Sequence, residues 1–172
     1  MDDAAERHFQ EFVVARSPAL MRLAYLLTGG DQQSAEDLLQ IALAKTASRW
    51  RAVDDPDGYV RRVMYHQQVS WWRLKWRRRE TQVALPPEEA RDDDTAAVDL
   101  RVTVRRAMAR LTARQRTVLV LRYFEDMPES EVARVLDCSV GTVRSTTHRS
   151  LARLRQLAPE LAALKNMTEV PQ

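Results

Sequence analysis

Residues 128–155 read PESEVARVLDCSVGTVRSTTHRSLARLR, and this stretch decides the fold of the chain. Pro128 fits the first position of a short helix, after which Cys138 and Ser139 turn the chain. Ser139 can cap a second helix that follows the turn. Two short helices that pack through apolar side chains across a tight turn form a helix-turn-helix. The side chains predicted to face inward are Val132, Ala133, Leu136, Val140 and Val143, followed by Leu151 and Leu154.

The outer face of the second helix predicts contact with duplex DNA. Its side chains are short hydrogen-bonding groups and arginines, which are the types that bind base edges and phosphates. The alternative is a plain helical hairpin with a solvated basic face. The predicted contacts are Thr142, Arg144, Ser145, Thr146, His148 and Arg149.

The charge distribution supports a nucleic-acid partner for this end of the chain. Residues 101–172 carry 13 basic and 7 acidic side chains, and lysine occurs in the whole chain only at positions 45, 75 and 165. Arginine offers a planar fork that suits phosphate and guanine. An arginine-favouring, G+C-rich coding sequence would give the same bias, and the two explanations do not exclude each other.

The composition argues against an enzyme, a metalloprotein and a membrane protein. The single cysteine, Cys138, permits no internal disulfide and no cysteine-based metal site, and the three histidines lack ligand spacing. No nucleophile or metal constellation is present, so we expect no catalytic residue, no cofactor, no metal and no small-molecule ligand. The acidic start MDDAAERHFQEF is not a signal peptide, and no apolar run has membrane-spanning length. The sequence therefore predicts a cytoplasmic protein.

Helical periodicity runs through the rest of the chain and predicts an all-α fold. Gly29 and Gly30 should end a first helix, Ser34 should cap a second helix, and Thr112 should form a capping box with Gln115. A loop at 54–58 precedes a further helix that starts near Tyr59. Residues 80–99 carry seven acidic side chains and two prolines, which predicts a flexible acidic linker between two small helical domains. The predicted bounds are 1–80, 81–97 and 98–160, with a short tail at 161–172.

The segment 71–79, WWRLKWRRR, interleaves aromatic and basic residues. One interpretation is a site for single-stranded DNA, where bases stack on rings and basic groups follow the backbone. The others are tryptophans packed in a small core and an amphipathic helix on a membrane surface. The segment alone does not choose among them.

Several segments in this order resemble a known family. AEDLLQ at 35–40, PDGYVRRVMYHQQVSWWRLKWRRRE at 56–80, the acidic stretch and LTARQRTVLVLRYFEDMPESEVARVLDCSVGTVRSTTHRSLARLR at 111–155 are similar to extracytoplasmic-function (ECF) sigma factors of bacterial RNA polymerase, SigE type. The resemblance covers residues 8–157. It implies two helical domains, sigma region 2 and sigma region 4, and a protein that directs core polymerase to −35 and −10 promoter elements.

The resemblance also implies roles for particular residues. The helix with AEDLLQ would dock on the clamp helices of the largest polymerase subunit, and region 4 on the flap of the second-largest subunit. The loop at 53–58 would capture a flipped −10 base, and the next helix would contact the melted strand. Relatives are often held by an anti-sigma factor, which makes one a candidate partner here. The implied sites are Asp37, Leu38, Gln40 and Ala44 for polymerase; Asp57, His66, Gln67, Ser70, Trp71, Arg73, Trp76 and Arg77 for the −10 strand; and Arg122 beside the recognition helix for the −35 element.

Three features depart from the family pattern. Asp137 stands where many relatives carry Gly, Ile41-Ala42-Leu43 replaces a more usual Glu-Thr-Phe, and Thr146 and His148 occupy positions that vary with promoter class. The main alternative function is a free-standing helix-turn-helix regulator that binds operator DNA without polymerase. A membrane-surface protein would not explain the helix-turn-helix.

Overall fold

The computed structural model describes residues 3–81 and 100–159, and the regular elements in these ranges are all helical. The N-terminal half contains α1 (Asp3–Thr28), α2 (Gln32–Ala47), the 3-10 turn η1 (Trp50–Ala52) and α3 (Pro56–Thr81). The C-terminal half contains α4 (Leu100–Ala109), α5 (Ala113–Leu119), the π-helical turn η2 (Val120–Phe124), α6 (Glu129–Leu136) and α7 (Val140–Leu157). The all-α prediction is confirmed for these residues. Residues 82–97 of the predicted linker and the tail at 161–172 lie outside them.

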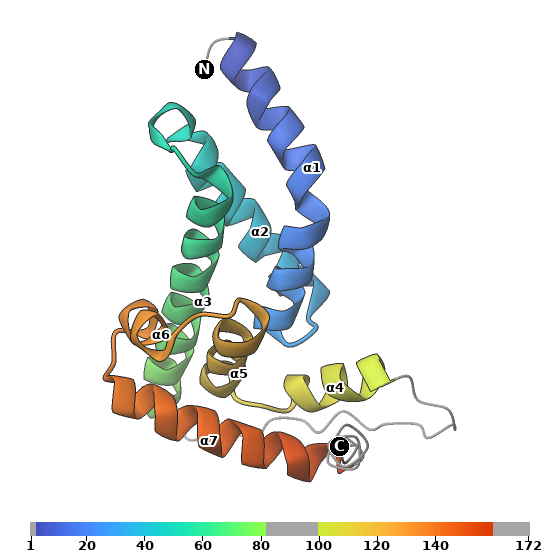
Figure 1. Ribbon diagram of the computed structural model, residues 1–172, viewed down its shortest axis with the longest axis vertical. Helices are drawn as coiled ribbons and strands as arrows, with labels where there is room; N and C mark the ends of the chain where they lie inside the picture. Colours follow the sequence, from blue (N-terminus) through green and yellow to red (C-terminus); the bar gives the residue numbers. More distant parts are fainter. Residues whose placement is uncertain (1–2, 82–99, 160–172) are drawn as a thin grey trace, which may run out of the picture.

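In the N-terminal half, α2 packs against both α1 and α3 (Figure 1). Its core is built from helical stripes on all three helices, because leucines and small residues recur at positions that share one face. Trp50 packs at the far end of the bundle, with ring centroids 5.1 Å from Phe9 and 5.3 Å from Phe12. Fully buried members of this core are Leu20, Leu23, Ala24, Leu27, Ala35, Leu38, Ala42, Val60 and Met64.

The helix ends follow local side-chain chemistry. Gly29 and Gly30 end α1 with φ of 77° and 88°, in the region that suits glycine, as predicted. Asp31 caps α2 by accepting the Ser34 N–H at 2.6 Å, so the prediction that Ser34 is the cap was wrong. Thr112 forms the predicted capping box with Gln115, at 3.2 and 3.1 Å.

In the C-terminal half, α6 and α7 form the helix-turn-helix, and α5 packs against α7 (Figure 1). Val132, Ala133 and Leu136 of α6 are buried against Val143 of α7, as predicted. Val140 was predicted to face inward but is 38% exposed, because it is the first residue of α7.

The two halves lie against each other. Helices α5 and α6 contact α3, α5 also contacts α1, and the buried apolar side chains of both halves form one cluster (Figure 1). A polar contact crosses the same boundary, because the Leu27 carbonyl of α1 accepts from Arg116 Nε of α5 at 3.0 Å. Within the N-terminal half the same carbonyl also accepts from Gln68 Nε2 of α3 at 2.9 Å. The halves that the sequence predicts to be separate domains therefore share an extensive interface.

Candidate nucleic-acid interface

The turn between α6 and α7 fixes the direction of the second helix. Asp137 ends α6 in the left-handed region, with φ 51°, and the Cys138 N–H donates to the Ala133 carbonyl at 3.0 Å. Ser139 then caps α7, since its hydroxyl accepts the Thr142 N–H at 3.1 Å, as predicted. The turn occupied by Asp137 is thus one that many proteins build with glycine.

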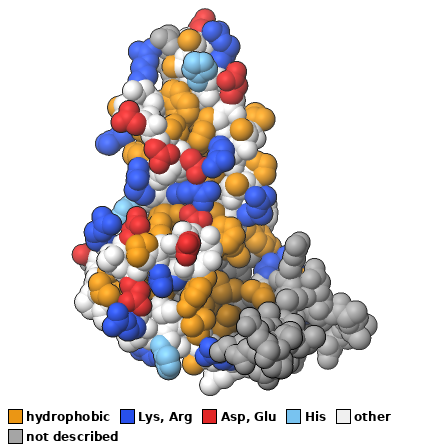
Figure 2. Space-filling model, viewed as in Figure 1, with side chains coloured by type: hydrophobic (Ala, Val, Ile, Leu, Met, Phe, Trp, Pro, Cys, Tyr) orange, Lys and Arg blue, Asp and Glu red, His pale blue; other side chains and the backbone are white. Residues whose placement is uncertain are grey.

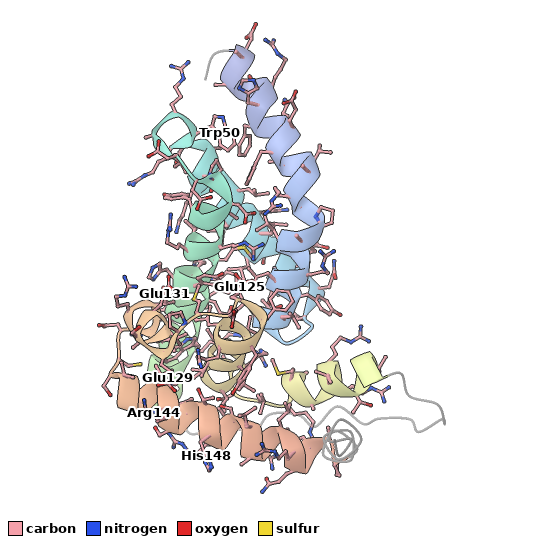
Figure 3. The ribbon with its side chains drawn as sticks, in the orientation of Figure 1. Trp50, Glu125, Glu129, Glu131, Arg144 and His148 are labelled. Carbon is pink, nitrogen blue, oxygen red and sulfur yellow. The ribbon has the colours of Figure 1, made fainter. Side chains whose placement is uncertain are left out.

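The outer face of α7 presents polar and basic side chains to solvent. Arg144 and His148 are exposed side chains of α7, and Arg144 lies beside Glu129 of α6 (Figure 3). Ser145 and Arg149 are exposed as well, and the Thr142 side chain is half-buried. We call Thr142, Arg144, Ser145, His148 and Arg149 the outer face of α7.

Arg144 is held by a carboxylate from the first helix of the motif. Its Nη2 lies 2.9 Å from Glu129 Oε2, and this hydrogen bond raises the pKa of Arg144. Arg144 is largely exposed, and exposed ion pairs contribute little to stability because water and salt screen them. The contact therefore orients the guanidinium while leaving most of it exposed to solvent.

Two side chains predicted to contact DNA in this half are placed differently. Thr146 is buried, with 5% of its surface exposed, because it lies on the same stripe of α7 as Val143 and Ser150. Arg122 is half-buried and donates from Nη1 to the Met127 carbonyl, which ties it to the chain before α6. Thr146 is therefore corrected to a core residue, and the −35 contact of Arg122 stays a prediction.

The second candidate face lies on α3. His66, Ser70 and Arg73 are exposed on α3, and we call these three residues the strand face. They line a groove of about 340 Å³ whose other wall is Arg134, Val135 and Asp137 of α6 and the turn. Arg73 Nη2 crosses the groove and donates to the Leu136 carbonyl at 2.8 Å.

The other residues predicted to contact the strand lie around this face. Gln67 is half-buried and accepts from Lys45 Nζ at 3.1 Å. Trp71 is half-buried against the core. The guanidiniums of Arg73 and Arg114 lie over the ring of the neighbouring Trp72, 5.7 and 5.8 Å from its centroid. The side chains of Trp76 and Arg77 lie outside the described residues.

Asp57 was predicted to lie in a loop, and this prediction was wrong. Pro56 begins α3, so Asp57 belongs to its first turn. Its Oδ1 accepts from Arg16 Nε and its Oδ2 from Arg61 Nε, both at 2.8 Å. The hydrogen bond from Arg16 holds the pKa of Asp57 below its usual value, and Arg61 adds to that effect. Asp57 is therefore an ionised group paired with two arginines.

The predicted polymerase-binding residues of α2 divide into two sets. Asp37, Gln40 and Ala44 are exposed on one side of the helix, and Asp37 accepts from Gln33 at 3.2 Å. Leu38 is fully buried, because it shares the inward stripe with Ala35 and Ala42. The predicted contact of Leu38 with a partner is corrected to a core role.

The sequence did not reveal the charged residues between the halves. Glu125 follows η2 and its carboxylate accepts two hydrogen bonds from Arg61 Nη1, at 2.7 and 2.9 Å, and one from the Tyr65 hydroxyl. Partial burial would lower the pKa of Arg61, but the hydrogen bonds to Asp57 and Glu125 outweigh it and raise the pKa. These partners are 60 and 64 residues apart, so no periodic or local signal could have joined them.

Charged side chains of both signs gather on the face where α3 meets α5 and α6 (Figure 2). Within residues 3–81 and 100–159, no cluster of three or more His, Cys, Asp or Glu side chains could hold a metal ion. None of the helices in those ranges combines the length and apolar character needed to cross a bilayer. Cys138 is a free, half-buried thiol.

Known proteins match this arrangement over most of the chain. Residues 101–154 match the family described as "Sigma-70, region 4". The chain is 42% identical over 151 residues to the RNA polymerase sigma-E factor of Streptomyces coelicolor, which covers 86% of this chain and 84% of the relative. It is 31% identical over 140 residues to the ECF RNA polymerase sigma factor SigM of Mycobacterium tuberculosis H37Rv, covering 80% of this chain and 70% of the relative.

A solved structure has the same fold. The sigma factor RpoE of Bartonella quintana, crystallised with the anti-sigma factor NepR, superposes with a TM-score of 0.61 at 22% identity. The match covers 88% of this chain and 96% of the Bartonella chain. At that identity the likeness concerns the fold, and it extends over both helical halves.

Proposed function

The chain belongs to the extracytoplasmic-function sigma factors of RNA polymerase, and we propose that it binds the core enzyme, reads promoter DNA with two helical faces and starts transcription. The observation that carries the proposal is the outer face of α7, where polar and basic side chains are exposed on a helix whose inner stripe packs on α6. This proposal places the action of the protein in the cytoplasm, where the polymerase works.

In the proposed division of work, residues 98–160 form region 4 and α7 enters the major groove at the −35 element. Arg144 is the strongest candidate for base recognition, since a guanidinium can bind guanine O6 and N7 together. Ser145, His148 and Arg149 would contact neighbouring bases or phosphates. Because the pair with Glu129 is exposed, exchanging its carboxylate for a guanine edge costs little.

Residues 1–80 would form region 2, which docks on polymerase and holds the melted −10 strand. The exposed Asp37, Gln40 and Ala44 on α2 are the proposed contacts with the clamp helices of the largest subunit. The strand face and Trp71 on α3 are the proposed contacts with unpaired bases, which stack on rings and follow basic groups. Gln67, Trp76 and Arg77 are further candidates from the sequence for contacts with the −10 strand. The flap of the second-largest polymerase subunit is the proposed docking partner of region 4.

The proposal contains no chemistry performed by this chain. It contributes to initiation by binding: its contacts position the polymerase on the promoter and stabilise the separated strands. An anti-sigma factor, such as the one bound in the Bartonella quintana structure, is a candidate partner.

The test is run-off transcription by core polymerase on a library of genomic fragments, with and without this protein. New protein-dependent start sites that share upstream sequences would support the proposal, and Arg144→Ala should reduce initiation at those sites. If no new transcripts appear while the chain alone binds duplex DNA specifically, the protein is a free-standing regulator.

A further inference from the structure

We propose that Glu129 is a positioning residue for −35 recognition: its carboxylate holds Arg144 ready for a base edge and keeps it from the DNA phosphates. This inference rests on the proposed function, because it concerns what the outer face of α7 reads. Glu129 was not among the residues predicted to act on DNA, since it precedes the recognition helix and carries the sign of charge that DNA repels.

The pair joins the two helices of the motif. Glu129 is the first residue of α6, Arg144 lies in the second turn of α7, and 2.9 Å separates Glu129 Oε2 from Arg144 Nη2 (Figure 3). The side chain of Glu129 is 27% exposed, whereas that of Arg144 is 72% exposed. The carboxylate is therefore the better anchored member, and the guanidinium extends from it into solvent.

The start of α6 keeps Glu129 in place. The Pro128 carbonyl accepts the N–H groups of Glu131 at 3.0 Å and of Val132 at 3.1 Å, which closes the first turn of the helix. Val132 and the following Ala133 are buried. An acid in the first turn is also stabilised by the partial positive charge at a helix N-terminus. The backbone that carries Glu129 is therefore fixed whether or not the ion pair is formed.

The ion pair orients Arg144 but occupies little of it. A guanidinium carries five N–H donors in a planar fork, and Glu129 accepts from Nη2 alone. The remaining donors stay available to a base edge, and guanine O6 and N7 can accept two of them together. Because a side chain that is already oriented loses less rotamer freedom on binding, the carboxylate lowers the entropic cost of that contact.

The charge of Glu129 separates the two kinds of acceptor that DNA offers. A phosphate is anionic and is repelled by a carboxylate at the same guanidinium, whereas a guanine edge is neutral. Even where the exposed pair opens on DNA, the carboxylate remains close to Arg144, so a phosphate stays disfavoured there. Glu129 therefore lowers non-specific affinity and raises base discrimination.

Arg149 provides a comparison on the same face. It is exposed, and its Nε donates to the Ser145 carbonyl of its own helix at 3.3 Å. Among the residues that the structure describes, no carboxylate forms an ion pair with Arg149, so none opposes a phosphate there. The two arginines of the outer face are expected to differ, with Arg144 on a base and Arg149 on a phosphate.

The experiment measures the binding of holoenzyme, assembled from core polymerase and this chain, to a promoter identified by run-off transcription. Each base pair of the −35 element is changed in turn, and dissociation constants are measured over a range of salt concentrations. Glu129→Ala removes the carboxylate, and Glu129→Gln restores an acceptor without the charge. The matched control is Glu131→Ala, which removes the same charge from the same turn of α6.

Relative to Glu131→Ala, we expect Glu129→Ala to reduce discrimination at one base pair about fivefold, the lower end of what a bidentate pair provides. Binding to non-specific DNA should not weaken, and its salt dependence should steepen by about one phosphate contact, because the freed Arg144 reaches the backbone. Glu129→Gln should recover part of the discrimination and keep the steeper salt dependence. In an Arg144→Ala background, Glu129→Ala should change neither quantity relative to the control.

Equal discrimination in Glu129→Ala and Glu131→Ala, or an effect of Glu129→Ala that persists in the Arg144→Ala background, would overturn the inference. Circular dichroism checks the helix content of every variant, and if Glu129→Ala loses helix content, Glu129→Gln carries the test through its salt dependence.

The inference and the proposed function can fail separately. If no transcription starts, the same variants are compared on duplex DNA bound by the chain alone. A retained effect of Glu129→Ala on base discrimination would then reject the proposed function and leave the inference standing. Normal transcription without that effect rejects the inference alone, and absence of binding to any DNA rejects both.

Discussion

Replacing Arg116 with methionine gives a direct measure of what a buried guanidinium contributes to this fold. Arg116 is 8% exposed and donates to four backbone carbonyls, those of Leu27, Met108, Ala109 and Leu111, at 3.0, 3.2, 3.4 and 3.1 Å. Burial lowers its pKa, which reflects the loss of hydration by the charged form. Methionine preserves most of the apolar stem and removes the donors.

The magnitude follows from which carbonyls keep a partner. Leu27 retains the bond from Gln68, and Met108 retains the bond from the Leu111 N–H at 3.2 Å. Leu111 is buried and loses the donor that Arg116 supplies, and a buried group left unsatisfied costs about 1–3 kcal/mol. Ala109 is exposed, so water can replace Arg116 at its carbonyl, and removing a buried charge returns part of the loss. We therefore expect Arg116→Met to lower the free energy of unfolding by about 1–3 kcal/mol.

The assay is urea unfolding followed by circular dichroism, comparing Arg116→Met with Arg110→Met. Arg110 is exposed, so its replacement should change the free energy of unfolding by less than about 0.5 kcal/mol. If both variants unfold at the same urea concentration with the same slope, the four hydrogen bonds do no more than offset the burial of the charge. That result would refute the reasoning.

Three further predictions concern single side chains. Arg144→Ala should cost about 1–3 kcal/mol of holoenzyme binding at one base pair of the −35 element; an equal loss across promoters changed at each position would instead indicate a phosphate contact. Asp137→Gly should raise the free energy of unfolding by up to about 1 kcal/mol, since glycine adopts φ 51° without strain and only an exposed 3.7 Å pair with Arg73 is lost; a decrease in urea midpoint would show that the pair contributes more. Burial and the hydrogen bond to Glu125 raise the pKa of Tyr65 above its ordinary 10.0. The unfolded chain then ionises first, so stability is fully present below pH 10 and falls at higher pH; Tyr65→Phe should flatten that fall in urea midpoints between about pH 9 and 11, and an unchanged slope would contradict the assignment.

Local chemistry made the helix-turn-helix predictable. Capping by Ser139 and the inward stripe of α6 depend on residues only a few positions apart, so the sequence contains the whole signal. Thr146 was misplaced because its chemistry suits DNA, although its spacing of three from Val143 puts it on the inner stripe. Leu38 was misplaced in the same way, by matching a motif rather than by following the stripe of α2.

The interface between the halves could not be predicted on the same basis. Glu125 and Arg61 each look like an ordinary solvated charge in their own segment, and only the folded chain brings them together across 64 residues. The acidic stretch between the halves also favours the prediction of two separate domains. That prediction concerns connectivity, and connectivity does not determine whether two domains pack together.

The aromatic and basic segment of α3 allowed three interpretations, and in the described part of it Trp71 and Trp72 pack against the core. A guanidinium from each half lies over the Trp72 ring, and its Nε1 is buried with no hydrogen-bond acceptor among the described residues. A buried donor without a partner is costly, so this indole N–H lowers what the packing of Trp72 contributes to stability. A ring face that stacks on a guanidinium can also stack on a base. The chemistry that made the segment resemble a strand-binding site is therefore the same chemistry that Trp72 uses at the contact between α3 and α5, and this is why the sequence alone could not separate the two interpretations.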